Sequence, residues 1–235
     1  MFGKAYWYLK NLISYSGADK VIKEYYMPDY NYYWSQVMEK GLGGGSYPII
    51  IDILEGRINN NAKLLDIGCG NGELIRLLSK KLTIQCLGVD ISEKAVQIAM
   101  RKGINTRIFD IFTDDFKKLG AFNYITMFEV LEHIPNAEQA IINIRDNFKS
   151  EIAFFSIPNS GSLYERMRLL RGRFPKQWVV HPGEHVRFWT LHDFKFMLRR
   201  LGIEIINVYG ISHNHRPINI GKSLFSIMFI FEVKL

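Results

Sequence analysis

From residue 63 onward, short apolar runs alternate with segments whose apolar residues recur at helical spacing. The apolar runs predict seven strands, at 63–67, 83–90, 105–111, 122–130, 151–159, 203–210 and 226–234. The segments between them predict helices at 71–81, 92–103, 136–148 and 190–202. Ser92 and Thr190 stand where helix N-caps belong, and Gly103 follows a predicted helix end. This alternation indicates an α/β fold whose mainly parallel sheet is covered by helices on both faces.

The first 60 residues carry a different pattern. The stretch 24–37 is rich in tyrosine, and 48–58 has apolar residues at helical spacing, beginning with a proline suited to a first helical turn. We expect residues 1–60 to form an N-terminal helical lid segment. Residues 61–235 are expected to form the main domain.

Composition narrows the class of protein. A chain of 235 residues with 48% hydrophobic residues fits one globular domain with additions. The two cysteines, Cys69 and Cys86, lack metal-type spacing, which favours a reducing compartment. No apolar run reaches the roughly 18 residues of a membrane span, and the N-terminus lacks the apolar core of a signal peptide. We therefore expect a cytoplasmic protein with no membrane span.

The formal net charge is +7, and part of it is local. The stretch 166–176 holds four arginines and a lysine without an acid, within a substrate-lid insertion predicted at 158–189. Its apolar residues fit an amphipathic basic helix. Such a helix can be a solvated cover, a lid in which Arg168 and Arg171 bind an anionic acceptor, or a peripheral foothold on anionic lipid. The basic run is short and no nucleic-acid-binding module accompanies it, so RNA is disfavoured as a partner.

A glycine-rich loop, LLDIGCGNGEL at 64–74, follows the first strand and opens a helix. Its glycines let the backbone approach a ligand at the helix N-terminus. A dinucleotide fingerprint needs a small residue where Glu73 stands, and no lysine follows as in a P-loop. The pattern is instead G-x-G-x-G preceded by Asp66.

DIGCGNG (66–72) resembles the first motif of class I S-adenosylmethionine (SAM) dependent methyltransferases. GVDIS (88–92), FDI (109–111) and FNYITMFEVLEHI (122–134) are similar to the family's next three strand ends. The segment 183–203 resembles the closing region of the methyltransferase-11/23-like subgroup, which includes ubiquinone-biosynthesis O-methyltransferases. The combination is specific for SAM binding and leaves the acceptor open.

The resemblance, which covers about residues 60–210, implies a Rossmann-like sheet of seven strands in the order 3-2-1-4-5-7-6. It also implies SAM as cofactor, with Asp90 on the ribose hydroxyls and Asp110 near the adenine amino group. The strand-four end would lie along the methionine part. The cofactor-binding residues expected on this basis are Asp66, Gly68, Cys69, Gly70, Gly72, Asp90, Ile91, Asp110, Ile111, Met127 and Phe128.

Methyl transfer needs a collinear acceptor, and a hydroxyl acceptor gains from a general base. His133, His181 and His185 are the candidates, because all three follow strands at the carboxyl edge of the sheet. Each can equally be a structural histidine. HPGEH (181–185) does not have the spacing of a metal-binding helix, and its internal Pro-Gly opposes a helix, so we predict no metal site. His192 is expected on a helix surface without a role.

The acceptor is expected to be a small-molecule oxygen, in a phosphorylated, sugar, nucleotide-linked or quinol-type compound. Nitrogen, carbon or RNA methylation stays open, as does a catalytically silent SAM-binding subunit. The oligomeric state is not predicted. Residues expected to face the acceptor, besides the two arginines of the insertion, are Tyr25, Tyr26, Tyr33, Trp34, Glu184 and Arg187.

Overall fold

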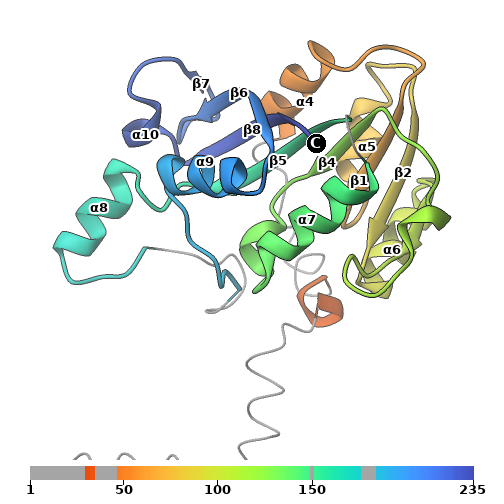
Figure 1. Cartoon of the computed structure of the whole chain (residues 1–235), viewed down its shortest axis with the longest axis horizontal. Coiled ribbons are helices and arrows are strands. Elements are labelled where there is room, and N and C mark those ends of the chain that lie inside the picture. Colours follow the sequence, from red (N-terminus) through yellow and green to blue (C-terminus); the bar gives the residue numbers. More distant parts are fainter. Residues whose placement is uncertain (1–29, 35–46, 149–150, 176–183) are drawn as a thin grey trace, which may run out of the picture.

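The computed structural model describes residues 30–34, 47–148, 151–175 and 184–235 (Figure 1). Three predicted site residues, Tyr25, Tyr26 and His181, lie outside these ranges. No helix in the described part of the chain has the length and apolar character needed to cross a membrane.

One mixed sheet organises the described chain, in the order β3-β2-β1-β4-β5-β8-β6-β7. Strands β1 to β5 pair in parallel, whereas β8 runs antiparallel between β5 and β6. The strands are β1 (Lys63–Ile67), β2 (Gln85–Asp90), β3 (Thr106–Ile108), β4 (Tyr124–Met127), β5 (Ile152–Pro158), β6 (Glu204–Ile211), β7 (Pro217–Ile218) and β8 (Met228–Lys234). The predicted Rossmann-like α/β fold is confirmed. The prediction of seven strands is wrong, because the sheet has an eighth strand, β7, which pairs with β6 at the outer edge. β7 is too short to leave a periodic pattern in the sequence.

Helices cover both faces of this sheet (Figure 1). They are α4 (Tyr47–Glu55), α5 (Glu73–Leu78), α6 (Glu93–Arg101), α7 (Ala137–Asn147), α8 (Leu163–Leu170), α9 (Leu191–Arg200) and α10 (Lys222–Phe225), with short 3-10 turns η1 (Phe116–Lys118) and η2 (Leu131–His133). One buried cluster joins the sheet to α7 and α9, and a second joins it to α4 and α5. Strands β1, β5 and β8 are buried at almost every position because both of their faces are covered.

Local signals fix several helix ends. The Ser92 hydroxyl caps α6 by accepting a hydrogen bond from the Ala95 backbone N–H. Thr190, the predicted N-cap of α9, forms a reciprocal capping box with Asp193. α4 buries Ile50, Ile51 and Leu54 against the sheet. The division of the chain at residue 60 stays a prediction.

Candidate active site

A cavity of about 440 Å³ opens at the carboxyl ends of β1, β2 and β4, where parallel sheets bind ligands. The predicted cofactor residues that line it are Gly68, Cys69, Gly70, Asp90, Ile91, Asp110, Ile111 and Phe128. Asp66 and Met127 are buried behind this lining, and Gly72 begins α5. The sequence motif therefore marks one continuous wall of the cavity.

The glycine loop is held close against its surroundings. The backbone N–H groups of Gly68 and Cys69 both donate to the Val89 carbonyl at the end of β2, at 2.8 and 3.0 Å. Gly70 has a φ of 53°, and a Cβ added there would lie 2.2 Å from a ring carbon of Trp34. Only glycine fits this position without displacing the aromatic ring.

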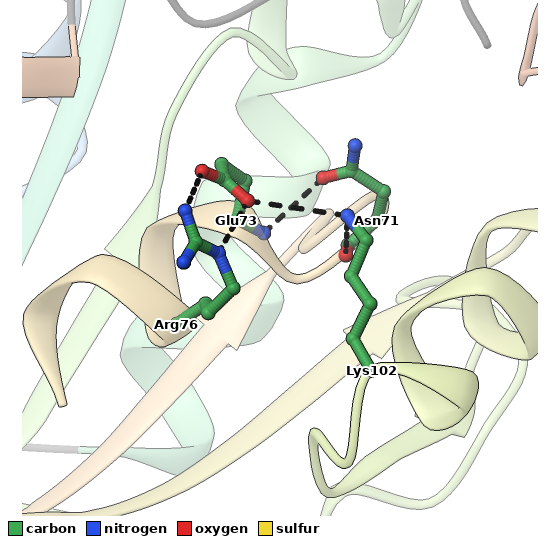
Figure 2. Close-up of polar contacts among 4 residues, drawn as sticks. All are labelled: Asn71, Glu73, Arg76 and Lys102. Atoms are coloured by element: carbon green, nitrogen blue, oxygen red, sulfur yellow. Dashed lines mark hydrogen bonds and ion pairs between the residues drawn. The ribbon is translucent and has the colours of Figure 1, made fainter. Parts of the chain in front are cut away.

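Polar side chains fasten the loop from outside the cavity (Figure 2). The Lys102 ammonium, just past α6, donates to the Asn71 carbonyl at 3.1 Å and lies 3.9 Å from the Glu73 carboxylate. Glu73 also forms an ion pair with Arg76, which lowers the pKa of the Glu73 carboxyl. At this position, where a dinucleotide fingerprint has a small residue, the Glu73 carboxylate is partly exposed and paired with both cations.

Asp90 joins the end of β2 to the glycine loop. One carboxylate oxygen accepts from the Gly70 N–H and the other from the Ser92 N–H, each at 2.8 Å. Burial raises the pKa of the Asp90 carboxyl, and the two backbone donors oppose that rise. Each carboxylate oxygen keeps a second lone pair, so two ribose hydroxyls can still donate to it.

Asp66 lies under the same loop. The Thr126 hydroxyl donates to its carboxylate at 2.7 Å. Burial, with a smaller contribution from the charge on Asp90, raises the pKa of the Asp66 carboxyl to about 7. The Asp66 carboxylate therefore joins β1 to β4 within the sheet, directly before the glycine loop, and Asp66 is not among the residues that line the cavity.

Residues 30–34 are helical and close one side of the cavity. The Asn31 carboxamide oxygen accepts from the Ser92 hydroxyl at 2.8 Å and from the Lys94 N–H at 3.1 Å. The Tyr30 hydroxyl donates to the His133 carbonyl at 3.3 Å. Tyr33 and Trp34, two of the residues expected to face the acceptor, line the cavity. The wall residues Tyr30 and Tyr47, and Asn31 beside them in sequence, were not predicted. Their roles depend on tertiary contacts that no sequence pattern encodes.

Two glutamates that the sequence reading missed follow β4. Glu129 lines the cavity with a left-handed backbone (φ 54°), and its carboxylate accepts from the Ser156 hydroxyl at 3.0 Å. Glu132 is fully buried, and no hydrogen-bond partner for either carboxyl oxygen exists among the described residues. Burial, together with the charge on Glu129, holds the pKa of the Glu132 carboxyl well above its usual range. Their position directly after a buried strand was the sequence signal that could have predicted these two glutamates as site residues.

The predicted bases His133 and His185 meet here. Their rings lie edge to face with centroids 4.7 Å apart. Nδ1 of His133 is 2.8 Å from the Glu184 carbonyl. Because a carbonyl only accepts, Nδ1 carries the proton in the neutral ring, and Nε2 is the unprotonated nitrogen. Burial and the neighbouring His133 lower the pKa of His185 to about 3, so that ring is neutral at physiological pH.

Glu132, His133 and His185 can also offer ligand atoms to a metal ion, since one atom from each lies within 4.8 Å of the others. A carboxylate with two imidazoles suits several divalent transition metals. The spacing within HPGEH (181–185) predicts no metal site in that segment alone. Glu132, His133 and His185 come from two segments, η2 and a stretch about 50 residues later, so that spacing says nothing about them. The absence of a metal site stays a prediction.

The predicted acceptor residues separate into two groups. Glu184 lines the cavity beside Tyr33 and Trp34. The Arg187 guanidinium instead donates to the Pro135 carbonyl and pairs with the Glu138 carboxylate. Arg168 pairs with Glu165 and donates to the Phe174 carbonyl, and Arg171 is exposed on the same turn of chain. None of the three arginines lines the cavity among the described residues.

Residues 48–208 match a family model described as a methyltransferase domain. The ubiquinone biosynthesis O-methyltransferase of Coxiella burnetii is 31% identical over 188 residues, which are 72% of this chain and 74% of that protein. The protein of the same name from Saccharophagus degradans is 24% identical over 65% of this chain and 67% of its own length. The matched part thus spans about two thirds of some of these relatives.

Solved structures show the same fold. A magnesium protoporphyrin IX methyltransferase from Synechocystis with bound SAH, the demethylated form of SAM, superposes with a TM-score of 0.63 at 17% identity, covering 92% of this chain and 99% of that one. A TehB-like SAM-dependent methyltransferase from Corynebacterium glutamicum gives 0.55 at 20% identity, covering 88% and 95%. The cyclase SpnF also superposes, with a TM-score of 0.58 at 16% identity and coverages of 79% and 80%.

Proposed function

Because the chain belongs to the methyltransferase domain family and is a SAM-dependent methyltransferase, we propose that it methylates an oxygen of a small-molecule acceptor. The observation that carries this proposal is His133, which lines the cavity with Nδ1 held by the Glu184 carbonyl. In the tautomer fixed by that bond, Nε2 is the basic nitrogen, which can take the proton of a hydroxyl substrate. Methylation of nitrogen, carbon or RNA, or SAM binding without turnover, are the competing functions.

In this proposal the cofactor occupies the wall formed by the glycine loop and the ends of β2 and β3. Asp90 receives the ribose hydroxyls, and Asp110 lies near the adenine. The Phe128 side of the cavity would take the methionine part, and Glu129 and His133 line the cavity on this side. The acceptor oxygen attacks the methyl carbon as the S–CH₃ bond breaks, and the demethylated cofactor leaves with the sulfur electron pair. The hydroxyl proton passes to Nε2 of His133.

The acidic groups around the cavity, and the lack of a lysine or arginine in its described lining, support an uncharged acceptor. Glu129 and Glu184 line the acceptor side, and Glu132 lies just behind it. Burial, with Glu184 nearby, raises the pKa of Tyr33 to about 12, so its phenol stays protonated as a hydrogen-bond donor. A phosphorylated or nucleotide-linked acceptor would meet these carboxyl groups without an arginine from the described lining. A quinol-type hydroxyl fits better, and the names of the relatives point the same way. A divalent ion held by Glu132, His133 and His185 would lower the pKa of a bound hydroxyl.

Turnover with labelled SAM tests the proposal, using quinols, sugars, phosphosugars, nucleotides and RNA as acceptors. We expect label in a hydroxyl of an uncharged acceptor and none in RNA. Label in RNA or in an amine would refute the oxygen assignment. Calorimetry with SAM runs alongside, because binding without turnover on any acceptor would favour the silent subunit. Each assay is repeated with added divalent ions and with a chelator.

A further inference from the structure

The helix α8 has an unusual surface for a helix of a globular domain. It runs from Leu163 to Leu170 and buries none of its residues. A surface helix ordinarily buries an apolar stripe against the core. Here Leu163, Met167 and Leu170 recur at i, i+4 and i+7 and are 43%, 40% and 79% exposed. The apolar stripe of α8 therefore faces away from the protein.

Arginines flank that stripe. On a helical projection Arg166 lies on one side of it and Arg171 on the other, and both are exposed. Arg173 is exposed in the following turn. The single acid of the helix, Glu165, is already paired with Arg168 on the opposite face. An apolar stripe between cationic borders is the pattern of a helix that lies in a membrane interface.

Figure 1 shows α8 projecting at the end of the molecule remote from α6, with α10 at the same end. The carboxamide of Asn159, just before α8, donates to the Ser223 carbonyl of α10 at 3.0 Å. The α10 region exposes Ile220 and Phe225, at 88% and 54%. Apolar side chains of two elements are thus exposed at one end of the fold.

Further positive charge lies beside α10. Lys195 and Arg199 of α9 line a shallow cleft with Lys222 of α10. Partial burial and the two neighbouring cations lower the pKa of Lys195. Cations grouped in this way favour an anionic partner.

From the exposed stripe, its arginine borders and the cations at the same end, we infer that α8 docks this protein on an anionic lipid bilayer. A helix this short is marginal in water and is stabilised by covering its apolar face. A second copy is disfavoured as the cover, because a two-fold contact would place the same arginines opposite each other. RNA would use the arginines and leave the apolar stripe exposed. α8 follows β5, at the same edge of the sheet as the cavity, so docking brings the cavity near the bilayer.

Sedimentation of the full chain with vesicles tests this inference independently of the methyl acceptor. One set of vesicles contains phosphatidylcholine alone, and the other contains phosphatidylcholine and phosphatidylglycerol in equal parts. We expect binding to the anionic vesicles only, weakened by salt. The double variants Met167→Glu/Leu170→Glu and Arg171→Glu/Arg173→Glu should each reduce binding about tenfold or more. Unchanged SAM affinity and melting temperature would show that these variants are folded.

Met100→Glu and Arg101→Glu are the matched controls, since both residues are exposed on α6, far from α8. Each should leave vesicle binding unchanged. The inference is overturned if wild-type protein ignores anionic vesicles, or if the controls lose as much binding as the α8 variants. It is also overturned if the α8 variants bind vesicles normally. Loss of a dimer in Met167→Glu/Leu170→Glu without loss of vesicle binding would assign the stripe to a second copy.

Discussion

The two sides of the cavity are built in different ways. The side that we propose for the cofactor comes from residues that directly follow β1, β2 and β3, so each strand end contributes a short contiguous motif. The acceptor side joins Glu129 and Glu132, after β4, to Glu184 and His185 about 50 residues later, with Tyr33 from the N-terminal segment. A common cofactor needs a fixed geometry that one motif can supply, whereas the acceptor is met by residues that only tertiary packing brings together.

The largest expected effect separates the two sides. His133→Ala should lower the turnover number by about 10²–10⁴-fold, because the hydroxyl proton loses its acceptor. The dissociation constant for SAM should stay within about threefold, since His133 faces the acceptor and not the motif wall. Single-turnover rates and calorimetry measure the two quantities. His192→Ala, on the exposed face of α9, is the control and should change neither. An equal loss in SAM affinity would show that His133 belongs to the cofactor side.

The next effect concerns Asp66, beneath the cofactor side. The pKa of the Asp66 carboxyl is raised from 3.8 to about 7 in the folded protein. At a pH below 3.8 the carboxyl is protonated in both states, and its contribution to the free energy of unfolding is then at its largest. That contribution falls as pH rises from about 4 to about 7, by roughly 4 kcal/mol at most. Asp66→Asn cannot ionise, so its unfolding free energy relative to wild type should rise over this pH range. Urea unfolding without cofactor at several pH values measures the difference. Asp52 is exposed, so the unfolding free energy of Asp52→Asn should change with pH as that of wild type does. The same pH dependence for Asp66→Asn and wild type would contradict the prediction.

The prediction for Asp90 is the reverse of that for His133: we expect its substitution to weaken SAM binding and to leave the rate at saturating SAM nearly unchanged. Asp90→Asn removes the charge that orders the glycine loop through Gly70 and the acceptor proposed for the ribose. The affinity for SAM should fall about 10–100-fold, the range expected for hydrogen bonds to a charged group. The rate at saturating SAM should change much less. Calorimetry and saturation kinetics separate these effects, and a rate loss that saturating SAM cannot restore would contradict the division into two sides.

The sequence was most informative where one element carries its own signal. The strands after residue 63, the N-cap Thr190 and the glycine loop each leave a recognisable pattern within a few consecutive residues. Met127 and Phe128 show the limit of such signals, because Met127 ends β4 with its side chain buried, and only Phe128, just past the strand, lines the cavity. β7 has two residues and no period to detect. The meeting of Glu132 with His185, or of Asn31 with Ser92, needs distances that only the folded chain defines.

The smallest expected effect comes from the outer support of the glycine loop. Lys102→Met keeps the length of the side chain and removes its bond to the Asn71 carbonyl and its charge near Glu73 (Figure 2). Partly exposed ion pairs contribute roughly 0–1 kcal/mol, so the affinity for SAM should fall no more than about fivefold. High salt, which already screens the wild-type pair, should reduce the difference further. Lys80→Met, on an exposed position beyond α5, controls for lost charge. A loss as large as that of Asp90→Asn would mean that the loop is held mainly from outside, and the motif itself would no longer account for the cofactor side.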